Sequence, residues 1–225
     1  MAVYIVEGFK SALIESRAAY VEHGEERSPE TARERSPRPS LERTSAEDYF
    51  QYSADTLDRE YCGSGAAVLN LGLRPSDGDY AALMHRFNPR TGASYVDNVR
   101  RGQLDGNMET RAGYSTCFNV DKSVSMLWAS LPRDKQIIIE KAMMEAARRT
   151  QEFAEKNGYY RYRNGDPGKI IAMNYLHFTS RSTEGNEPDM HLHVHSEIVA
   201  EILCPDGKWR ALDASELFAR QAEMA

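Results

Sequence analysis

The chain has 225 residues, of which 41% are hydrophobic and 28% charged, and its formal net charge is −6. This length fits one domain with a full hydrophobic core, and the composition is ordinary for a globular protein. Because no apolar run approaches ~18 residues and the start is not a signal peptide, we expect no membrane insertion. The acidic charge argues against a general polyanion binder but permits a local basic groove.

The cysteines predict a reducing environment. Cys62, Cys117 and Cys204 lie far apart and form no CxxC pair. Such spacing indicates free thiols in the cytoplasm and not a disulfide framework.

The first fifth of the chain predicts one helix and one segment without a core. Residues 11–23 have apolar residues at helical spacing. Residues 22–48 are rich in Arg, Glu, Ser and Pro and contain a single Leu. Such a composition cannot bury enough apolar area to offset the entropy of ordering. We expect a flexible insertion at 22–48 within a single domain that spans 1–225.

The middle of the chain predicts short helices, one strand and one long helix. A Gly-containing turn leads into a short helix after residue 60, and a second helix at 79–92 is stopped by Asn-Pro. Residues 113–120 alternate as in a half-buried strand. Asp121 caps the next helix. The clearest helix covers 132–158, and its expected inner stripe is Ile139, Ala142, Met143, Ala146, Thr150 and Phe153.

The last part predicts a β-rich region. Long strands are expected at 169–180 and 190–204, followed by a turn at 205–207, the strand 208–212 and a helix from residue 213. Because the chain ends inside that helix, we expect the natural domain to continue. The fold class is therefore α+β, with an antiparallel sheet covered by helices on one face.

Alternation along 190–204 gathers histidines on one face. Met190, Leu192, Val194 and Ile198 share the face that should pack on helices, while the other carries His191, His193, His195, Glu197 and Glu201. Alternate residues lie ~6.7 Å apart, so two neighbouring histidines can converge on one ion ~2 Å from each nitrogen. The outer two lie ~13 Å apart and cannot share an ion without strain.

A third ligand should therefore come from another segment, and His177 in the neighbouring strand is the natural candidate. The alternative is a polar outward face that happens to contain histidines. Neutral imidazoles suit Zn, Mn, Ni or Fe. An all-histidine site leaves the positive charge of the ion available for an anion such as phosphate.

Four segments resemble motifs of conjugative relaxases of the TraI/TrwC (MobF) type, which belong to the HUH endonuclease superfamily. Residues 111–129 are similar to the family's "GYDLTFSxPKSVSxLxA", and residues 177–202 are similar to "HxTSR…DPxLHTHxVVxN". Residues 61–73 resemble "WxGKGAExLGL", and residues 206–218 resemble "xGxWxxLxxxxL". The four matches follow the family order over most of the chain.

The resemblance implies an HUH relaxase/Rep-like fold and a specific activity. A conjugative DNA relaxase nicks one strand of plasmid DNA at the origin of transfer through a tyrosine. It forms a covalent 5′-phosphotyrosyl intermediate and later rejoins the strand. The expected cofactor is a divalent metal, Mg or Mn, with Zn or Ni able to bind in vitro. The expected partners are single-stranded DNA at the transfer origin, accessory relaxosome proteins and a coupling protein.

The resemblance also assigns site residues. It implies metal ligation by His177, His191 and His193, with His195 outside the set. It implies Tyr20 as the nucleophile, with Tyr49 as the second candidate.

One position departs from the family pattern. Ser115 stands where the family has an aspartate that orients a ligand histidine or assists the tyrosine. Ser115 or Asn119 could replace its hydrogen bond but not its charge, whereas Glu197, on the histidine face, is another candidate substitute. DNA contacts are expected from Lys122, Arg181, Arg100 and Arg101, with bases stacked on aromatic rings.

Three other functions remain open from the sequence. The chain could be an HUH replication initiator with the same chemistry, or a catalytically impaired relaxase-like module that binds single-stranded DNA. The histidines alone would also permit a metal-dependent hydrolase unrelated to DNA.

Overall fold

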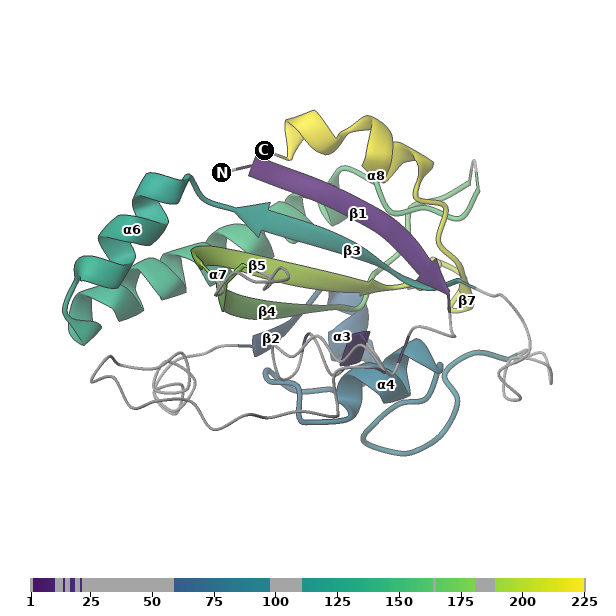
Figure 1. The fold of residues 1–225 in the computed structure, drawn as a ribbon. Coiled ribbons are helices and arrows are strands. Elements are labelled where there is room, and N and C mark those ends of the chain that lie inside the picture. Colours follow the sequence, from purple (N-terminus) through teal and green to yellow (C-terminus); the bar gives the residue numbers. More distant parts are fainter. Residues whose placement is uncertain are drawn as a thin grey trace.

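The centre of the fold is an antiparallel sheet with the strand order β1-β3-β5-β4-β2 (Figure 1). The structure, a computed structural model, describes residues 2–10, 14, 17, 18, 21, 59–97, 111–163, 165–180 and 189–224. The strands of this sheet are β1 (Ala2–Lys10), β2 (Arg59–Cys62), β3 (Arg111–Asn119), β4 (Ala172–Thr179) and β5 (Met190–Val199). A separate ribbon pairs β6 (Glu201–Leu203) with β7 (Trp209–Ala211).

Two helices cover one face of the sheet, as the sequence predicted. They are α6 (Lys122–Ser130) and α7 (Arg133–Lys156), and α7 runs behind β4 and β5 (Figure 1). The shorter helices are α3 (Ser64–Val68), α4 (Asp79–Met84), α8 (Ser215–Ala219) and the 3-10 turn η4 (Gln221–Glu223). In the described part of the chain, no helix has the length and apolar character needed to cross a membrane.

Several predicted elements are confirmed, with shifted ends. The Asp121 side chain caps α6 by accepting a hydrogen bond from the Ser123 backbone at 2.8 Å. The helix expected at 79–92 ends at Met84, and the strand expected at 190–204 is interrupted at Ala200. Strands β1 and β2 were not predicted.

The buried face of α7 is displaced by about one residue from the inner stripe that the sequence predicted. Met143 is buried as expected, but Phe153 is 44% exposed, and Gln136, Glu140 and Gln151 are buried instead. These polar side chains have partners inside the core. Glu140 accepts a hydrogen bond from the Trp128 indole at 2.9 Å, and Gln151 donates to the Ser196 hydroxyl at 2.7 Å. Hydrophobic periodicity could not find this face because its buried positions are partly polar.

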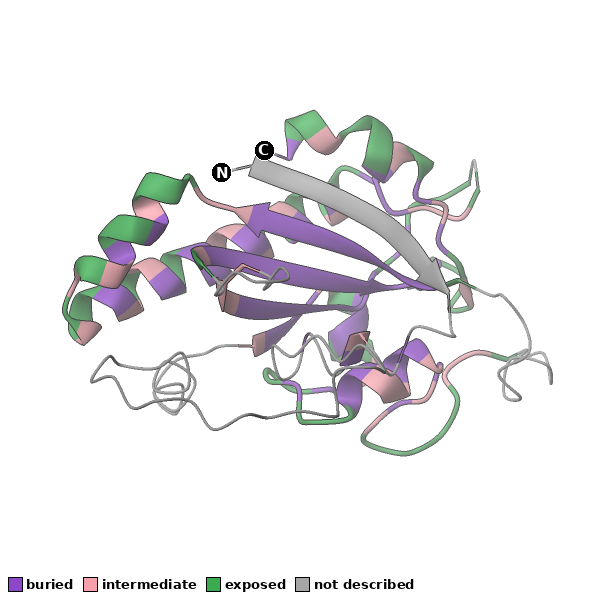
Figure 2. Cartoon of the chain, in the orientation of Figure 1, coloured by how far each residue is buried: buried purple, intermediate pink, exposed green. Residues whose placement is uncertain are grey.

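A smaller layer covers part of the opposite face, which carries the histidines. Among residues 11–23, the four that the structure describes (Ile14, Arg17, Ala18 and Val21) are helical. The three apolar ones are buried in a cluster with Met173 and Tyr175 of β4 and with the apolar side chains of α4. As a result β4 and β5 are buried along most of their length (Figure 2). The predicted insertion at 22–48 lies outside the described residues.

The buried ion pair of Arg86 with Glu201 predicts a pH dependence of stability. The Arg86 Nε donates to Glu201 Oε1 at 2.5 Å. Burial raises the pKa of Glu201 from 4.5 to about 7, although the Arg86 charge acts to lower it. The folded state therefore binds more protons than the unfolded state between these values, so the free energy of unfolding falls as pH rises through this range. The change attributable to Glu201 is on the order of 3 kcal/mol.

Urea unfolding at pH 4.5, 6 and 8 tests this contribution. The double variant Glu201→Gln/Arg86→Met leaves no unpaired charge and should lose less stability than the wild type between pH 4.5 and 8. Glu216→Gln, at a partly exposed position on α8, is the matched control and should behave as the wild type. Equal pH slopes in the double variant and the wild type would show that Glu201 does not titrate as described.

Candidate metal centre

Backbone pairing of β5 on both sides sets the positions of the histidines. His193 lies opposite His177 of β4 and opposite Asn119 of β3. His195 lies opposite Cys117 of β3. Because directly opposite residues point to the same face of a sheet, these side chains gather on one face. The expectation that His177 lies beside the histidines of the next strand is confirmed, because His177 and His193 are paired.

The rings of His193 and His195 turn their Nε2 atoms toward each other, at 3.2 Å. The Nδ1 of His193 lies 2.8 Å from the carbonyl oxygen of His191. A carbonyl oxygen only accepts, so this Nδ1 carries the proton, and the Nε2 of the neutral ring presents a lone pair. Two nitrogens 3.2 Å apart, each ~2.0–2.1 Å from one ion, subtend about 100° at that ion, near the tetrahedral angle. The pair therefore has the geometry for ligating a single metal ion.

Two further donors lie beside this pair. The Cys117 sulfur and the His193 and His195 ring nitrogens all lie within 4.8 Å of one another. The His177 ring centre is 4.9 Å from that of His195 and 5.3 Å from that of His193. In this structure the His177 Nε2 donates to the Val21 carbonyl at 3.2 Å. A bound ion could therefore recruit a third ligand from Cys117 directly, or from His177 after its ring rotates.

His191 is placed differently. Its Nε2 donates to the Asn119 amide oxygen at 3.0 Å, so this nitrogen is already bound to Asn119. Burial, and then the positive charge of Lys122, lower the pKa of His191. His191 is also absent from the group of convergent donor atoms found among the described residues. The expectation that His191 is a ligand and that His195 is not does not agree with this geometry.

A repeated pattern explains why the sequence and the geometry favour different neighbours of His193. Residues 190–193 read Met-His-Leu-His and residues 192–195 read Leu-His-Val-His, and both resemble the family's Leu-His-Thr-His. The proline of the family motif aligns with the first, whereas the leucine aligns with the second. Cys117 was not predicted as a donor, although the alternation of residues 113–120 puts it on the same face as Ser115 and Asn119.

The other predicted site residues have the following positions. Ser115 donates to Glu197 at 2.8 Å, and Lys122 pairs with Asp189 and donates to the Met190 carbonyl at 2.5 Å. The remaining predicted residues lie outside the part of the chain that the structure describes: Tyr20, Tyr49, Arg100, Arg101 and Arg181.

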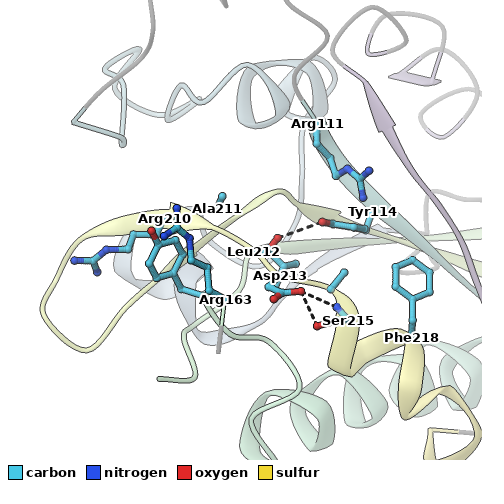
Figure 3. Close-up of a pocket in the computed structure, with 11 residues that line it drawn as sticks. Arg111, Tyr114, Arg163, Arg210, Ala211, Leu212, Asp213, Ser215 and Phe218 are labelled. Atoms are coloured by element: carbon cyan, nitrogen blue, oxygen red, sulfur yellow. Dashed lines mark hydrogen bonds between the residues drawn. The ribbon is translucent and has the colours of Figure 1, made fainter. Parts of the chain in front are cut away.

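A cavity of about 760 Å³ lies elsewhere, between β3, β7 and α8 (Figure 3). None of the histidines that the structure describes lines it. Its Arg210 is held by both carboxylate oxygens of Asp206, and Arg163 lies over the Tyr162 ring at 5.1 Å from its centre. Because these cations already have partners and the donors of the histidine face are absent, the cavity is a weaker candidate for metal chemistry.

The fold and the site together define a class: an antiparallel sheet backed by two helices, with buried, convergent histidines on its other face. The family model of the TrwC relaxase matches residues 15–225. The chain belongs to the TrwC relaxase family. No curated protein is significantly similar in sequence.

Solved structures support the same fold. A metal-bound complex of the conjugative relaxase TrwC with oriT DNA has a TM-score of 0.68 and 22% identity, covering 99% of this chain and 65% of that one. A copper-bound complex has a TM-score of 0.67, 23% identity and the same coverage. A complex with a 27-mer DNA of the recognition hairpin and cleavage site has a TM-score of 0.64 and 20% identity, covering 99% and 64%. The chain thus spans slightly less than two thirds of the length of these structures.

The arrangement of the histidine rings predicts unequal effects of single substitutions. His195→Ala removes one of the two facing Nε2 atoms and should weaken divalent-metal binding by more than about 100-fold, the upper range for loss of an outer-shell group. His191→Ala should weaken it by less than about 10-fold, because His191 supports the site only through its backbone carbonyl and Asn119.

Isothermal titration with Mn²⁺ or Zn²⁺ measures both affinities. His85→Ala, which removes a histidine just after α4, is the matched control and should bind as the wild type. A larger loss in His191→Ala than in His195→Ala would restore the ligand set expected from the sequence.

Proposed function

We propose that the chain is the nicking domain of a conjugative DNA relaxase, acting on single-stranded plasmid DNA at the origin of transfer. The observation that carries the proposal is the pair of facing Nε2 atoms of His193 and His195 in a member of the TrwC relaxase family. The resemblance of TrwC complexes with oriT DNA supports the choice of substrate. As a cytoplasmic relaxase it would act with accessory relaxosome proteins and a coupling protein.

The proposed ligand set is His193, His195 and His177, with Cys117 as a further donor. A divalent ion held there would stabilise the charge that develops on the scissile phosphate. The protein's own part is to aim both Nε2 atoms at one point. The ring of His193 is held in this orientation by its Nδ1 proton, which is donated to the His191 carbonyl. Burial of both rings, 4% and 7% exposed, keeps water from competing for the lone pairs.

The proposed nucleophile is Tyr20. Its oxygen would form a bond to the phosphorus while the bond to the 3′ oxygen breaks, which leaves a 5′-phosphotyrosyl enzyme and a free 3′-OH. The number of phosphoester bonds is unchanged, so the strand can be rejoined. Support comes from Val21, the next residue in the chain. The Val21 carbonyl accepts a hydrogen bond from His177, so the chain next to Tyr20 touches a proposed metal ligand. Tyr49 and its neighbours lie outside the described residues.

The metal proposed from the sequence is Mg²⁺ or Mn²⁺, with Zn²⁺ or Ni²⁺ binding in vitro. Mg²⁺ prefers oxygen ligands, so an imidazole site favours Mn²⁺ of the first two. The Cys117 sulfur beside the histidines favours softer ions still.

Cys117→Ser should therefore change metal preference. The substitution should lower Zn²⁺ affinity by about 10-fold and change Mn²⁺ affinity far less, because thiolate sulfur is a soft ligand. Competition titrations with a chromophoric chelator measure both constants. Buried Cys62→Ser, on another strand, is the control. An unchanged ratio of the two affinities would mean that Cys117 takes no part in binding.

A covalent adduct tests the proposed function itself. The chain is incubated with Mn²⁺ and labelled single-stranded oligonucleotides that carry the transfer origin or the replication origin of the host plasmid. The wild type and Tyr49→Phe should give a protein–DNA adduct on a denaturing gel with the transfer origin, and Tyr20→Phe should not. An adduct with the replication origin alone would favour an initiator.

The absence of any adduct would favour the other candidate, an impaired module that only binds single-stranded DNA. Ser115 in place of the family's aspartate motivates that alternative. An adduct that survives Tyr20→Phe but not Tyr49→Phe would reverse the choice of nucleophile.

A further inference from the structure

A fully buried carboxylate lies directly behind the histidine pair. Glu197 is on β5, two residues after His195 and on the same face, and its side chain is 0% exposed. Its Oε1 accepts hydrogen bonds from Arg17 Nη2 at 2.6 Å and from Ser115 Oγ at 2.8 Å. The same oxygen lies 4.0 Å from His195 Nδ1. The other oxygen, Oε2, is buried and accepts no hydrogen bond within the described part of the chain.

Such a carboxylate is costly to bury, so its partners matter. An ionised carboxylate loses several kcal/mol of solvation in the interior unless opposite charge and hydrogen bonds compensate. Arg17 provides the charge and Ser115 one hydrogen bond, which leaves acceptor capacity on Oε2. The nearest imidazole nitrogen that the structure records against Glu197 is Nδ1 of His195.

We propose that Glu197 is a positioning residue of the metal centre, which holds His195 with its Nδ1 protonated and its Nε2 lone pair directed at the ion that it would share with His193. This deepens the proposed function and rests on it for the presence of a metal at these histidines. The 4.0 Å separation is longer than a hydrogen bond, and a small rotation of the ring or the carboxylate closes it. A carboxylate at this place fixes the imidazole tautomer and raises the basicity of the ligand nitrogen.

The two histidines then have the same tautomer for two different reasons. The Nδ1 of His193 is fixed by a backbone carbonyl, which is neutral. The Nδ1 of His195 faces a carboxylate, which adds negative charge to the site. Without that charge, the donor set of imidazoles would carry the full positive charge of an ion in a buried place.

The register of the sheet explains why Ser115 is compatible with this role. Ser115 and Glu197 are directly opposite each other on β3 and β5, on one face. Side chains at such positions have Cβ atoms ~4.5–5.5 Å apart, so a carboxylate on either strand reaches the same space. The carboxylate that the resemblance led us to expect at Ser115 is supplied here from the opposite strand.

Arg17 gives the carboxylate a second role. Burial acts to lower the pKa of the Arg17 guanidinium, but the charge and hydrogen bond of Glu197 raise it overall. The pair links the helical residues around Arg17 to the centre of the sheet. Tyr20, the proposed nucleophile, follows Arg17 by three residues in the sequence. One carboxylate therefore connects the segment of the proposed nucleophile to a proposed metal ligand.

Removing the negative charge of Glu197 in one variant and the positive charge of Arg17 in another tests the proposal. Glu197→Gln keeps the size of the side chain and removes its charge, and should weaken Mn²⁺ and Zn²⁺ binding by about 10–100-fold. Arg17→Gln keeps the carboxylate beside His195, where the bound ion compensates its charge, and should keep metal affinity the same or raise it. A purely structural ion pair would make both variants lose affinity together.

A second test moves the carboxylate from position 197 on β5 to position 115 on β3. Ser115→Asp/Glu197→Gln returns the charge to the same space from β3 and should restore metal affinity to within about threefold of the wild type. Glu60→Gln, which alters a buried carboxylate on β2, is the control and should bind metal normally. If Glu197→Gln alone does not fold, the double variant carries the test.

Wild-type metal affinity in Glu197→Gln, or equal losses in Glu197→Gln and Arg17→Gln, would overturn the proposal. So would a folded double variant that remains weak. Affinity is measured by titration without DNA. A wild-type chain that binds metal and forms no DNA adduct therefore contradicts the proposed function alone and leaves this result standing.

Discussion

The backbone pairing of β5 with β3 on one side and with β4 on the other is the constraint on which the site depends. A strand alternates its side chains, so one register fixes which residues enter the core and which form the histidine face. Leu192, Val194 and Ile198 pack into the core beneath α6 and α7. The intervening His193 and His195 then point to the other face. A slip of one residue would exchange these two sets and destroy the core and the donor cluster together.

Burial gives the histidine face its chemical character. The helical residues Ile14, Ala18 and Val21 cover part of this face with α4, and the rings of His193 and His195 on this face are buried. Polar groups in such a place must be satisfied by one another, and here a carbonyl, an amide and a hydroxyl satisfy most of them. Oε2 of the Glu197 carboxylate accepts no hydrogen bond within the described part of the chain. The resulting network orients the two imidazole rings before any ion is bound, and such preorganisation is what a site for transition-state charge requires.

The sequence could predict those features that follow from local pattern. The alternation of β5, the cap at Asp121 and the pairing that brings His177 beside the histidines all follow from strand and helix periodicity. The buried stripe of α7 could not be predicted, because Gln136 and Gln151 are buried through partners on distant elements. The choice between His191 and His195 was equally out of reach, because both have the same spacing from His193. The contacts of the folded chain separate them, because the Nε2 of His195 faces that of His193 whereas the Nε2 of His191 is bonded to Asn119.

The most direct test of the central account is to locate the ion. A crystal of the chain soaked with Mn²⁺ or Zn²⁺ would give an anomalous difference peak at the metal. The account predicts one peak ~2.0–2.2 Å from the Nε2 atoms of both His193 and His195, with His177 or Cys117 turned toward it. A peak bound by His191 and His193, with His195 left outside the coordination sphere, would contradict it.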